Sequence, residues 1–245
     1  ARGDQCDDCG KTLDPKDLID MVCKICSKSE VINFRNSEHY FLKLSSFENK
    51  LKDWLNSKNN FKANVQKTSL GFMSEGLLDR PITRDIDWGI TLPLEGDDWS
   101  SKRVYVWFEA VQGYYSCARI WGSRYAKKHA HPDGEDAWKN WWTYPEGGDP
   151  PKHIYFMGKD NIPFHTIIWP AIIMGLNSPG GPGNVSPVPL PGNLVLEENV
   201  SANEYLMLQG DQFSKSRRHA VWLPSYLERY DPDALRSVSY THLTL

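Results

Sequence analysis

The sequence lacks the features that mark a membrane or secreted protein. Its longest uncharged stretch, residues 162–196, is interrupted by several prolines and glycines, so no transmembrane helix can be read from it. Residues 1–5 contain no initiating methionine and no apolar signal core, which predicts that the chain begins inside a longer protein. Since nothing else suggests secretion, we expect a cytoplasmic protein without a membrane partner.

An excess of positive charge is also missing. The 28 Lys and Arg residues are offset by 31 Asp and Glu residues, giving a net charge of -3. No bulk positive field therefore draws nucleic acid to the protein, which argues against DNA as a partner and requires any RNA contact to be local. The 40% hydrophobic and 24% charged content is that of a globular chain with a buried core.

Cysteine is scarce and unevenly placed. Four of the five cysteines lie in two short motifs, Cys6-x-x-Cys9 and Cys23-x-x-Cys26, and only Cys117 follows. Each motif can close a tight turn that presents two thiolates to Zn²⁺ at about 2.3 Å. A pair of disulfides is the alternative, although nothing else indicates an oxidising compartment. The spacing favours zinc at all four positions, and the two pairs need not share one ion.

The periodicity of apolar residues predicts helices at two places. Ser45-x-x-Glu48 has the pattern of a capping box and opens a helix whose apolar residues share one face. Those residues are Phe47, Leu51, Trp54 and Leu55. Pro163 opens a second apolar helix that we expect to run to about Met174.

Two strand-then-helix patterns predict an α/β sheet. Residues 104–108 form a β-branched and aromatic run ahead of a helical segment, 114–125. Residues 154–157 form a second buried strand, ahead of the helix that Pro163 opens. Composition predicts two connections, an exposed one and a Pro/Gly-rich loop: 127–152 and 178–193. We expect ligands at the strand ends of such a sheet.

A polar turn, Gly158-Lys159-Asp160-Asn161, follows the second predicted strand and precedes a helix whose amides can bind an anion. Asp160 has the chemistry to accept both ribose hydroxyls, Lys159 to hold a phosphate, and His165 to face the same crevice. Such turns favour Gly, Asp and Asn in any case, so an ordinary polar turn is the alternative.

Two further groups of residues suggest a nucleotide and a substrate site. The loop 213–217, Phe-Ser-Lys-Ser-Arg, can wrap a triphosphate and stabilise a departing pyrophosphate, although a solvated basic loop is the alternative. Aromatic rings surround the predicted strand ends: Trp107, Tyr114, Phe164, His165 and Trp169. Rings at such positions are commonly core residues.

Taken together, these motifs resemble the methionyl-tRNA synthetases, class I synthetases with a Rossmann catalytic domain. The similar segments are 1–10 (zinc knuckle), 36–42, 82–89 (return from the insert), 105–110 (core strand) and 156–165, which is nearly the family consensus. The loop 213–217 stands where the family has Lys-Met-Ser-Lys-Ser. The resemblance runs in the family's order from residue 1 to about residue 236.

The resemblance implies an α/β fold, the second half of a class I Rossmann-type catalytic domain with a zinc-knuckle insertion. The implied units are 1–35 (zinc-knuckle part of the connective insert), 36–103 (remainder of the insert and return to the core), 104–210 (second half of the Rossmann domain) and 211–237 (phosphate-binding signature loop and following helix). Residues 238–245 are expected to be a non-native tail, because the helical pattern stops there and they match a reading frame of a sequencing adaptor.

The implied reaction joins L-methionine to ATP as methionyl-adenylate and passes the methionyl group to tRNA(Met), through positioning and charge stabilisation. The implied methionine pocket is Trp107, Ala110, Tyr114, His165 and Trp169. ATP, with Mg²⁺, would meet Gly158, Asp160 and Lys215, and the implied catalytic residues are Ser214, Lys215 and Ser216. The implied Zn²⁺ ligand types are Cys6, Cys9, Cys23 and Cys26, each pair completing its site with an upstream pair.

Some positions depart from the family pattern. Residues 109–114 read Glu-Ala-Val-Gln-Gly-Tyr instead of Asp-Ala-Pro-Ile-Gly-Tyr, Gln212 replaces the first Lys of the signature, and Arg218 replaces Gly. The family's His-Ile-Gly-His segment and anticodon-binding domain are absent, so we expect the isolated chain to be inactive. The alternatives are a valyl, leucyl or isoleucyl class I synthetase, and a non-catalytic zinc-ribbon RNA-binding module.

Overall fold

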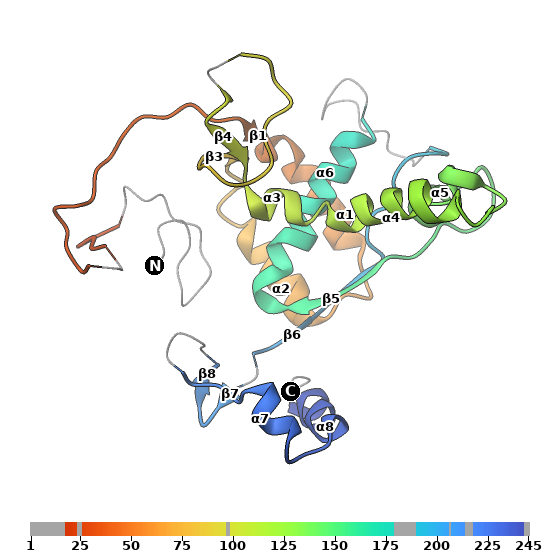
Figure 1. Ribbon diagram of the computed structural model, residues 1–245. Helices are drawn as coiled ribbons and strands as arrows, with labels where there is room; N and C mark the ends of the chain where they lie inside the picture. The colour runs from red at the N-terminus through yellow and green to blue at the C-terminus, as the bar shows by residue number, and fades with distance from the viewer. Residues whose placement is uncertain are drawn as a thin grey trace.

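The core forms where amphipathic helices pack together in the computed structural model (Figure 1). The residues described are 18–23, 26–96, 99–178, 190–205, 207–213 and 218–242. Helix α1 is Glu48–Ser57, α2 is Ala63–Phe72, and α6 is Trp169–Leu176, continuing a π-helical segment, Phe164–Ile168. Their inward residues and those of the adjoining turns are fully buried in one cluster: Leu44, Leu51, Leu55, Val65, Ile162, Ile167 and Ala171. The predicted apolar face of α1 and the predicted helix after Pro163 are therefore confirmed.

The predicted capping box at the start of α1 is wrong. A 3-10 turn, Leu44–Phe47, precedes the helix, so Ser45 lies inside a helical turn and makes no cap. Its hydroxyl donates instead to Asp79 Oδ1 at 2.7 Å, and Glu48 Oε2 accepts from the amide of Leu77 at 2.8 Å. Both polar side chains bind the segment after α2, which explains why neither serves the helix terminus.

Short two-stranded sheets flank the helices in the described part of the chain. Three are antiparallel: β1 (Phe41–Leu42) with β2 (Arg80–Pro81), β3 (Thr83–Asp85) with β4 (Lys102–Val104), and β7 (Met207–Leu208) with β8 (Asp211–Gln212). The fourth is parallel and pairs β5 (Ile154–Gly158) with β6 (Asn199–Asn203), in a register from Ile154↔Asn199 to Gly158↔Asn203. The parallel pair confirms a mixed α/β fold and the predicted strand at 154–157. The predicted burial of this strand is wrong for Ile154 and Phe156, which are exposed, and Tyr155 alone is buried.

The predicted strand at residues 104–108 is wrong. Strand β4 ends at Val104, the amide of Tyr105 makes a last bond to the carbonyl of Ile82 at 2.8 Å, and helix α3 occupies Val106–Ala110. The amides of Phe108 and Glu109 bond back to the carbonyl of Tyr105, which starts the helix. The helix predicted at 114–125 is present as α4, Gly113–Trp121, followed by a π-helical segment, Gly122–Ala126.

The segment 127–152 is not simply the exposed connection that its composition predicts. It contains a 3-10 turn, Gly134–Asp136, and the short helix α5, Lys139–Trp142. The rings of Trp138 and Trp142 are buried in a second apolar cluster, together with Val111, Tyr155, Trp169, Ile173 and Leu194. Residues 179–189 of the predicted loop lie outside the described part.

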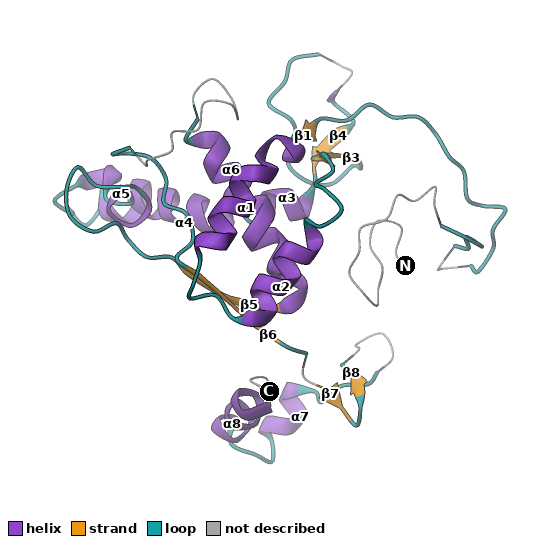
Figure 2. Ribbon diagram, turned by 180° about the vertical axis from the view of Figure 1, so that it is seen from behind, coloured by secondary structure: helices purple, strands orange, loops and turns teal. Residues whose placement is uncertain are grey.

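The carboxyl-terminal elements form a separate group in both views (Figures 1 and 2). Strands β7 and β8 are followed by α7, Leu223–Leu227, and α8, Pro232–His242. Helix α8 continues past the point where the sequence predicts that the helical pattern stops, so that prediction is wrong. Within the described ranges, no helix combines the length and the hydrophobicity that a bilayer crossing requires.

Candidate functional site

The carboxyl end of β5 carries the predicted polar turn. Gly158 ends the strand, a 3-10 turn covers Lys159–Asn161, and the long helical segment begins behind it. A β carbon at Gly158 would lie 2.8 Å from Asp160 Oδ1, so any side chain there would displace that carboxylate. Asn161 Nδ2 donates to the same oxygen at 3.4 Å. The exposed Asp160 carboxylate is thus held against the strand end.

Lys159 does not point into open space. Its ammonium group donates to Glu204 Oε2 at 2.6 Å and lies 4.8 Å from the ring centroid of Tyr205. Glu204 and Tyr205 follow the end of β6, the strand that pairs with β5. The side chain that the sequence suggests as a phosphate ligand is therefore committed to an ion pair.

His165 is a buried, neutral hydrogen-bond acceptor. Its Nδ1 lies 3.0 Å from the carbonyl oxygen of Asn161, which can only accept, so Nδ1 carries the proton. Its Nε2 therefore accepts from the hydroxyl of Tyr114 at 2.9 Å. Burial lowers the pKa of His165, which keeps the imidazole uncharged near neutral pH.

An aromatic wall connects this histidine to the second apolar cluster. We use this name for Tyr114, Tyr155, His165 and Trp169, which come from α4, β5 and the helical segment ending in α6. The rings of Tyr114 and Tyr155 pack edge to face at 4.9 Å, and those of Tyr155 and His165 lie 5.5 Å apart. Trp169 Nε1 donates to the hydroxyl of Tyr155 at 3.2 Å. Burial raises the pKa of Tyr155, so its hydroxyl stays protonated.

The predicted methionine-pocket residues are brought together only in part. Tyr114, His165 and Trp169 belong to the aromatic wall. Trp107 is half exposed on α3, and its ring lies 5.8 Å from that of Phe164, the neighbour of His165. Ala110 lies on the exposed side of the same helix and takes part in none of these contacts.

Tyr155 is the member of the wall that sequence reasoning missed. It sits at the centre, touching Tyr114 and His165 and accepting from Trp169. The signal was available in the alternation of β5, since Tyr155 points inward while Ile154 and Phe156 are exposed. A period of two within the strand would have placed Tyr155 on the face of His165.

Only half of the predicted zinc ligands can be placed, because Cys6 and Cys9 lie outside the described residues. Cys23 is half buried and Cys26 is exposed. The amide of Ser27 donates to the carbonyl of Cys23 at 2.7 Å, and Ser27 has a positive φ of 57°. Within the described ranges, no group of three or more metal-binding side chains gathers.

The predicted phosphate loop also lies outside the described residues. Ser214, Lys215 and Ser216 belong to the gap between residues 213 and 218. The flanking elements are described: β7 and β8 pair on one side, and His219 contacts the carbonyl of Leu208 at 2.8 Å on the other. The segments before and after the loop therefore contact each other. The predicted binding of phosphate by the loop stays a prediction.

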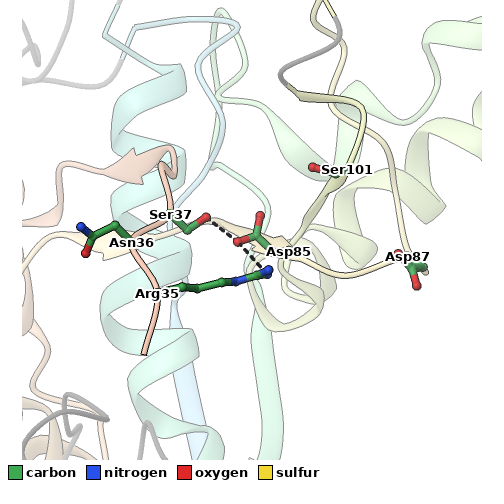
Figure 3. Close-up of a pocket in the computed structure, with 6 residues that line it drawn as sticks. All are labelled: Arg35, Asn36, Ser37, Asp85, Asp87 and Ser101. Atoms are coloured by element: carbon green, nitrogen blue, oxygen red, sulfur yellow. Dashed lines mark hydrogen bonds and ion pairs between the residues drawn. The ribbon is translucent and has the colours of Figure 1, made fainter. Parts of the chain in front are cut away.

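A polar cavity of about 400 Å³ lies elsewhere, between the chain before β1 and the β3–β4 hairpin (Figure 3). It is lined by Arg35, Asn36, Ser37, Asp85, Asp87 and Ser101. Lys102 donates to Asp85 Oδ1 at 2.6 Å, Ser37 donates to Oδ2, and Arg35 lies 3.5 Å from the same carboxylate. The hydrogen bonds from Lys102 and then Ser37 lower the pKa of Asp85 to about 2. The charge of Asp85 at this cavity is therefore already paired with donors of the protein. No residue of the aromatic wall lines the cavity.

Comparison with known proteins gives one family. Residues 1–243 match the family described as tRNA synthetases class I (M). A methionine–tRNA ligase of Roseiflexus castenholzii is 43% identical over 239 residues, which is 96% of this chain and 36% of that protein. One of Thermoplasma acidophilum is 46% identical over 236 residues, 96% of this chain and 38% of its own. The chain thus spans little more than a third of the curated relatives that it matches.

The fold is also similar to solved structures. The structure of Mycobacterium tuberculosis methionyl-tRNA synthetase in complex with methionyl-adenylate has a TM-score of 0.58 and 24% identity, covering 84% of this chain and 33% of that one. A second structure of that synthetase, bound by methionyl-adenylate, has a TM-score of 0.55 and 23% identity, covering 80% and 32%. At this identity the likeness shows the fold alone.

Proposed function

This chain belongs to the class I tRNA synthetases of the methionine group, and on that basis we propose that the complete protein is a methionine–tRNA ligase. The enzyme joins the carboxylate of L-methionine to the α-phosphate of ATP and releases pyrophosphate. It then transfers the methionyl group from the adenylate to tRNA(Met). The observation that carries this assignment is the aromatic wall beside the polar turn at the end of a parallel strand.

The aromatic wall has the chemistry of a methionine pocket. A thioether side chain is flexible, uncharged and polarisable, and it makes favourable contacts with aromatic ring edges. Tyr114, His165 and Trp169 offer such rings in fixed positions, and Trp107 lies beside them on Phe164. Because His165 is neutral and hydrogen-bonded on both nitrogens, it adds no uncompensated charge to the pocket.

The polar turn supports ATP binding at the same edge of the sheet. Gly158 lets the backbone approach the adenosine, and Asp160 accepts from the ribose hydroxyls. Lys215 neutralises charge that develops on the departing pyrophosphate, and the hydroxyls of Ser214 and Ser216 donate to the phosphates. Mg²⁺ arrives with ATP as part of the substrate. Activation in this scheme needs no covalent intermediate with the protein, only positioning and charge stabilisation.

The exposed face of the parallel pair supports a larger domain. Parallel sheets are normally covered on both faces, yet Phe156 is 76% exposed and Ile154 is exposed beside it. We infer that the remainder of the protein covers this face and supplies the other half of the site. In this division residues 104–210 are the second Rossmann half, 36–103 are the remainder of the insert and the return to the core, and 211–237 are the signature loop and the following helix.

The zinc knuckle belongs to residues 1–35 in this proposal. Cys23 and Cys26, on the turn described above, hold Zn²⁺ together with thiolates from the Cys6–Cys9 motif or from an upstream pair. Such a zinc ion supplies folding energy rather than catalysis. Metal analysis of the complete protein tests the two-site arrangement, which requires about two zinc ions per chain and fails with about one.

The decisive experiment is pyrophosphate exchange by the full-length protein. We expect exchange between ATP and labelled pyrophosphate that depends on methionine and is not supported by valine, leucine or isoleucine. Exchange with one of those amino acids would favour a sister synthetase. RNA binding without any exchange would favour a zinc-ribbon module, although that alternative does not account for the family match over residues 1–243.

A further inference from the structure

The two parallel strands are joined by an ion pair immediately beyond their last ladder pair. Gly158 and Asn203 are the final paired residues, and Lys159 and Glu204 are the next residue on each strand. The ammonium group of Lys159 lies 2.6 Å from Glu204 Oε2. The two side chains are 41% and 38% exposed, so this pair lies at the surface of the candidate site.

Glu204 is fixed from a second direction by helix α2. Asn64 Nδ2 donates to Glu204 Oε1 at 3.2 Å and also lies 3.4 Å from the carbonyl oxygen of Ala202. Asn64 is the second residue of α2, and the next residue, Val65, is fully buried in the core. The hydrogen bonds from Lys159 and then Asn64 lower the pKa of Glu204. Both carboxylate oxygens are therefore engaged by charged or polar donors.

Stability alone does not account for this arrangement. A half-exposed ion pair contributes little to folding, because water already solvates both charges. Its position, in contrast, is specific. On one side it adjoins Asp160, whose carboxylate rests on Gly158. On the other side the chain leaves β6 through Glu204 and Tyr205 and continues to β7 and β8.

We propose that Lys159, Glu204 and Asn64 form a clasp that holds the carboxyl ends of β5 and β6 in register for nucleotide binding, and that Lys159 is a positioning residue and not a phosphate ligand. The identity of the nucleotide rests on the proposed function, whereas the clasp rests on the contacts above. Because Asp160 adjoins the clasped end of β5, the clasp sets where the predicted ribose contact lies relative to the end of β6. Small displacements between such groups are costly, up to about a hundredfold for 1 Å.

Kinetics of the full-length protein separate the two roles of Lys159. If the clasp positions the nucleotide, Lys159→Ala and Glu204→Gln each raise the KM for ATP by about tenfold and leave the KM for methionine unchanged. Lys159→Arg retains most of the activity, and the exchanged pair Lys159→Glu with Glu204→Lys recovers it to within about threefold. If Lys159 binds phosphate, Glu204→Gln frees it and does not raise the KM for ATP, and the exchanged pair shows no recovery. That result would overturn the proposal.

The chain offers a matched control at the opposite end of the same strand. Lys58 pairs with Glu198 Oε2 at 3.6 Å, just before β6 begins. Glu198→Gln removes an ion pair whose carboxylate is as exposed as that of Glu204, 40% against 38%, without touching the carboxyl end. We expect the KM for ATP of this variant to equal that of the parent protein. An equal rise in both variants would mean that general loosening of β6, and not the clasp, changes the site.

Hydrogen exchange tests the clasp independently of the reaction. In the substrate-free protein, Glu204→Gln should accelerate amide exchange in peptides that cover both 154–161 and 199–205, while Glu198→Gln should leave residues 158–161 unchanged. Unchanged exchange at both strand ends in Glu204→Gln would overturn the clasp even if methionine activation is confirmed. Accelerated exchange in a protein that shows no methionine-dependent activity would instead overturn the proposed function alone.

Discussion

The two halves of the candidate site are held by different forces. The aromatic wall is built from buried rings, with His165 and Trp169 almost fully enclosed and linked to tyrosine hydroxyls. The strand-end clasp is built from half-exposed charges, Lys159 and Glu204, with Asn64 behind them. Burial fixes shape and is nearly independent of salt, whereas exposed charge pairs are weakened by screening. The difference predicts that the aromatic wall, the proposed amino acid half of the site, is rigid. The clasp, which belongs to the proposed nucleotide half, should be adjustable.

The largest effect is expected for Trp169→Ala. This side chain lies in the second apolar cluster and donates to Tyr155, so its loss leaves a cavity and an unpaired hydroxyl. We expect the free energy of unfolding to fall by about 3–5 kcal/mol, measured by urea denaturation. Trp107→Ala is the matched control, because that ring is half exposed and should cost much less. An equal fall in the free energy of unfolding in the two variants would show that burial of Trp169 does not distinguish it from the half-exposed Trp107.

The next effect concerns the charged half. Lys215→Ala should lower the adenylation rate of the complete protein about a hundredfold, or about 3 kcal/mol, because the ammonium acts on charge that appears in the transition state. Methionine affinity should change far less, and Gln212→Lys should leave the rate similar or raise it. Stopped-flow adenylation measures both. A near-normal rate in Lys215→Ala would show that the loop is wrongly assigned.

The free energy of unfolding should depend on pH because of Glu197, whose charge would act on Tyr155 of the aromatic wall. Glu197 is fully buried, both its carboxylate oxygens lack a hydrogen-bond partner among the described residues, and burial raises its pKa to about 8. Between its unfolded pKa, about 4.5, and about 8 the folded state retains a proton that the unfolded state has released, so stability falls as pH rises. Glu197→Gln should flatten this fall, which is roughly 3–4 kcal/mol between pH 5 and 8.

The control for that titration is Asp85, a carboxylate whose pKa is lowered and not raised. Asp85 is surrounded by donors that lower its pKa to about 2, so it stays charged throughout the same range. Asp85→Asn should reduce stability by a similar amount at pH 7 and at pH 8, where His39, 3.9 Å from the same carboxylate and with its pKa lowered by burial, is uncharged. If Glu197→Gln behaves in the same way, with no change of slope, the buried carboxyl is charged in the folded protein and our account of it is wrong.

The smallest effect is expected for Tyr114→Phe. The substitution keeps the ring that packs on Tyr155 but removes the hydroxyl that donates to His165 Nε2. The loss of one hydrogen bond to a buried acceptor should cost about 1 kcal/mol and raise the KM for methionine several-fold, with the KM for ATP unchanged. An effect on ATP alone would place this tyrosine in the nucleotide half.

The sequence correctly predicted those elements that are determined by residues close to one another along the chain. The apolar face of α1, the strand β5 and the polar turn at Gly158 followed from periodicity and turn chemistry. The run 104–108 was assigned to the wrong element, since β-branched and aromatic residues occur in helices as well as in strands and the ladder between β3 and β4 ends at Val104. The burial of Trp138 depended on packing against distant segments.

The clasp was beyond prediction for the same reason. Lys159 and Glu204 are separated by 45 positions, and their contact exists only because β5 and β6 are paired in one particular register. Strand β6 itself was not predicted, as its sequence, Asn-Val-Ser-Ala-Asn, has little strand preference. From the sequence alone, a lysine in a polar turn at a strand end therefore resembled a phosphate ligand.

The most direct test of the two-part site is pyrophosphate exchange by the full-length protein at rising salt, from about 0.05 to about 0.5 M KCl. We predict methionine-dependent exchange in which the KM for ATP rises several-fold across this range while the KM for methionine stays nearly constant. A parallel rise of both constants, or exchange that does not depend on methionine, would contradict the account.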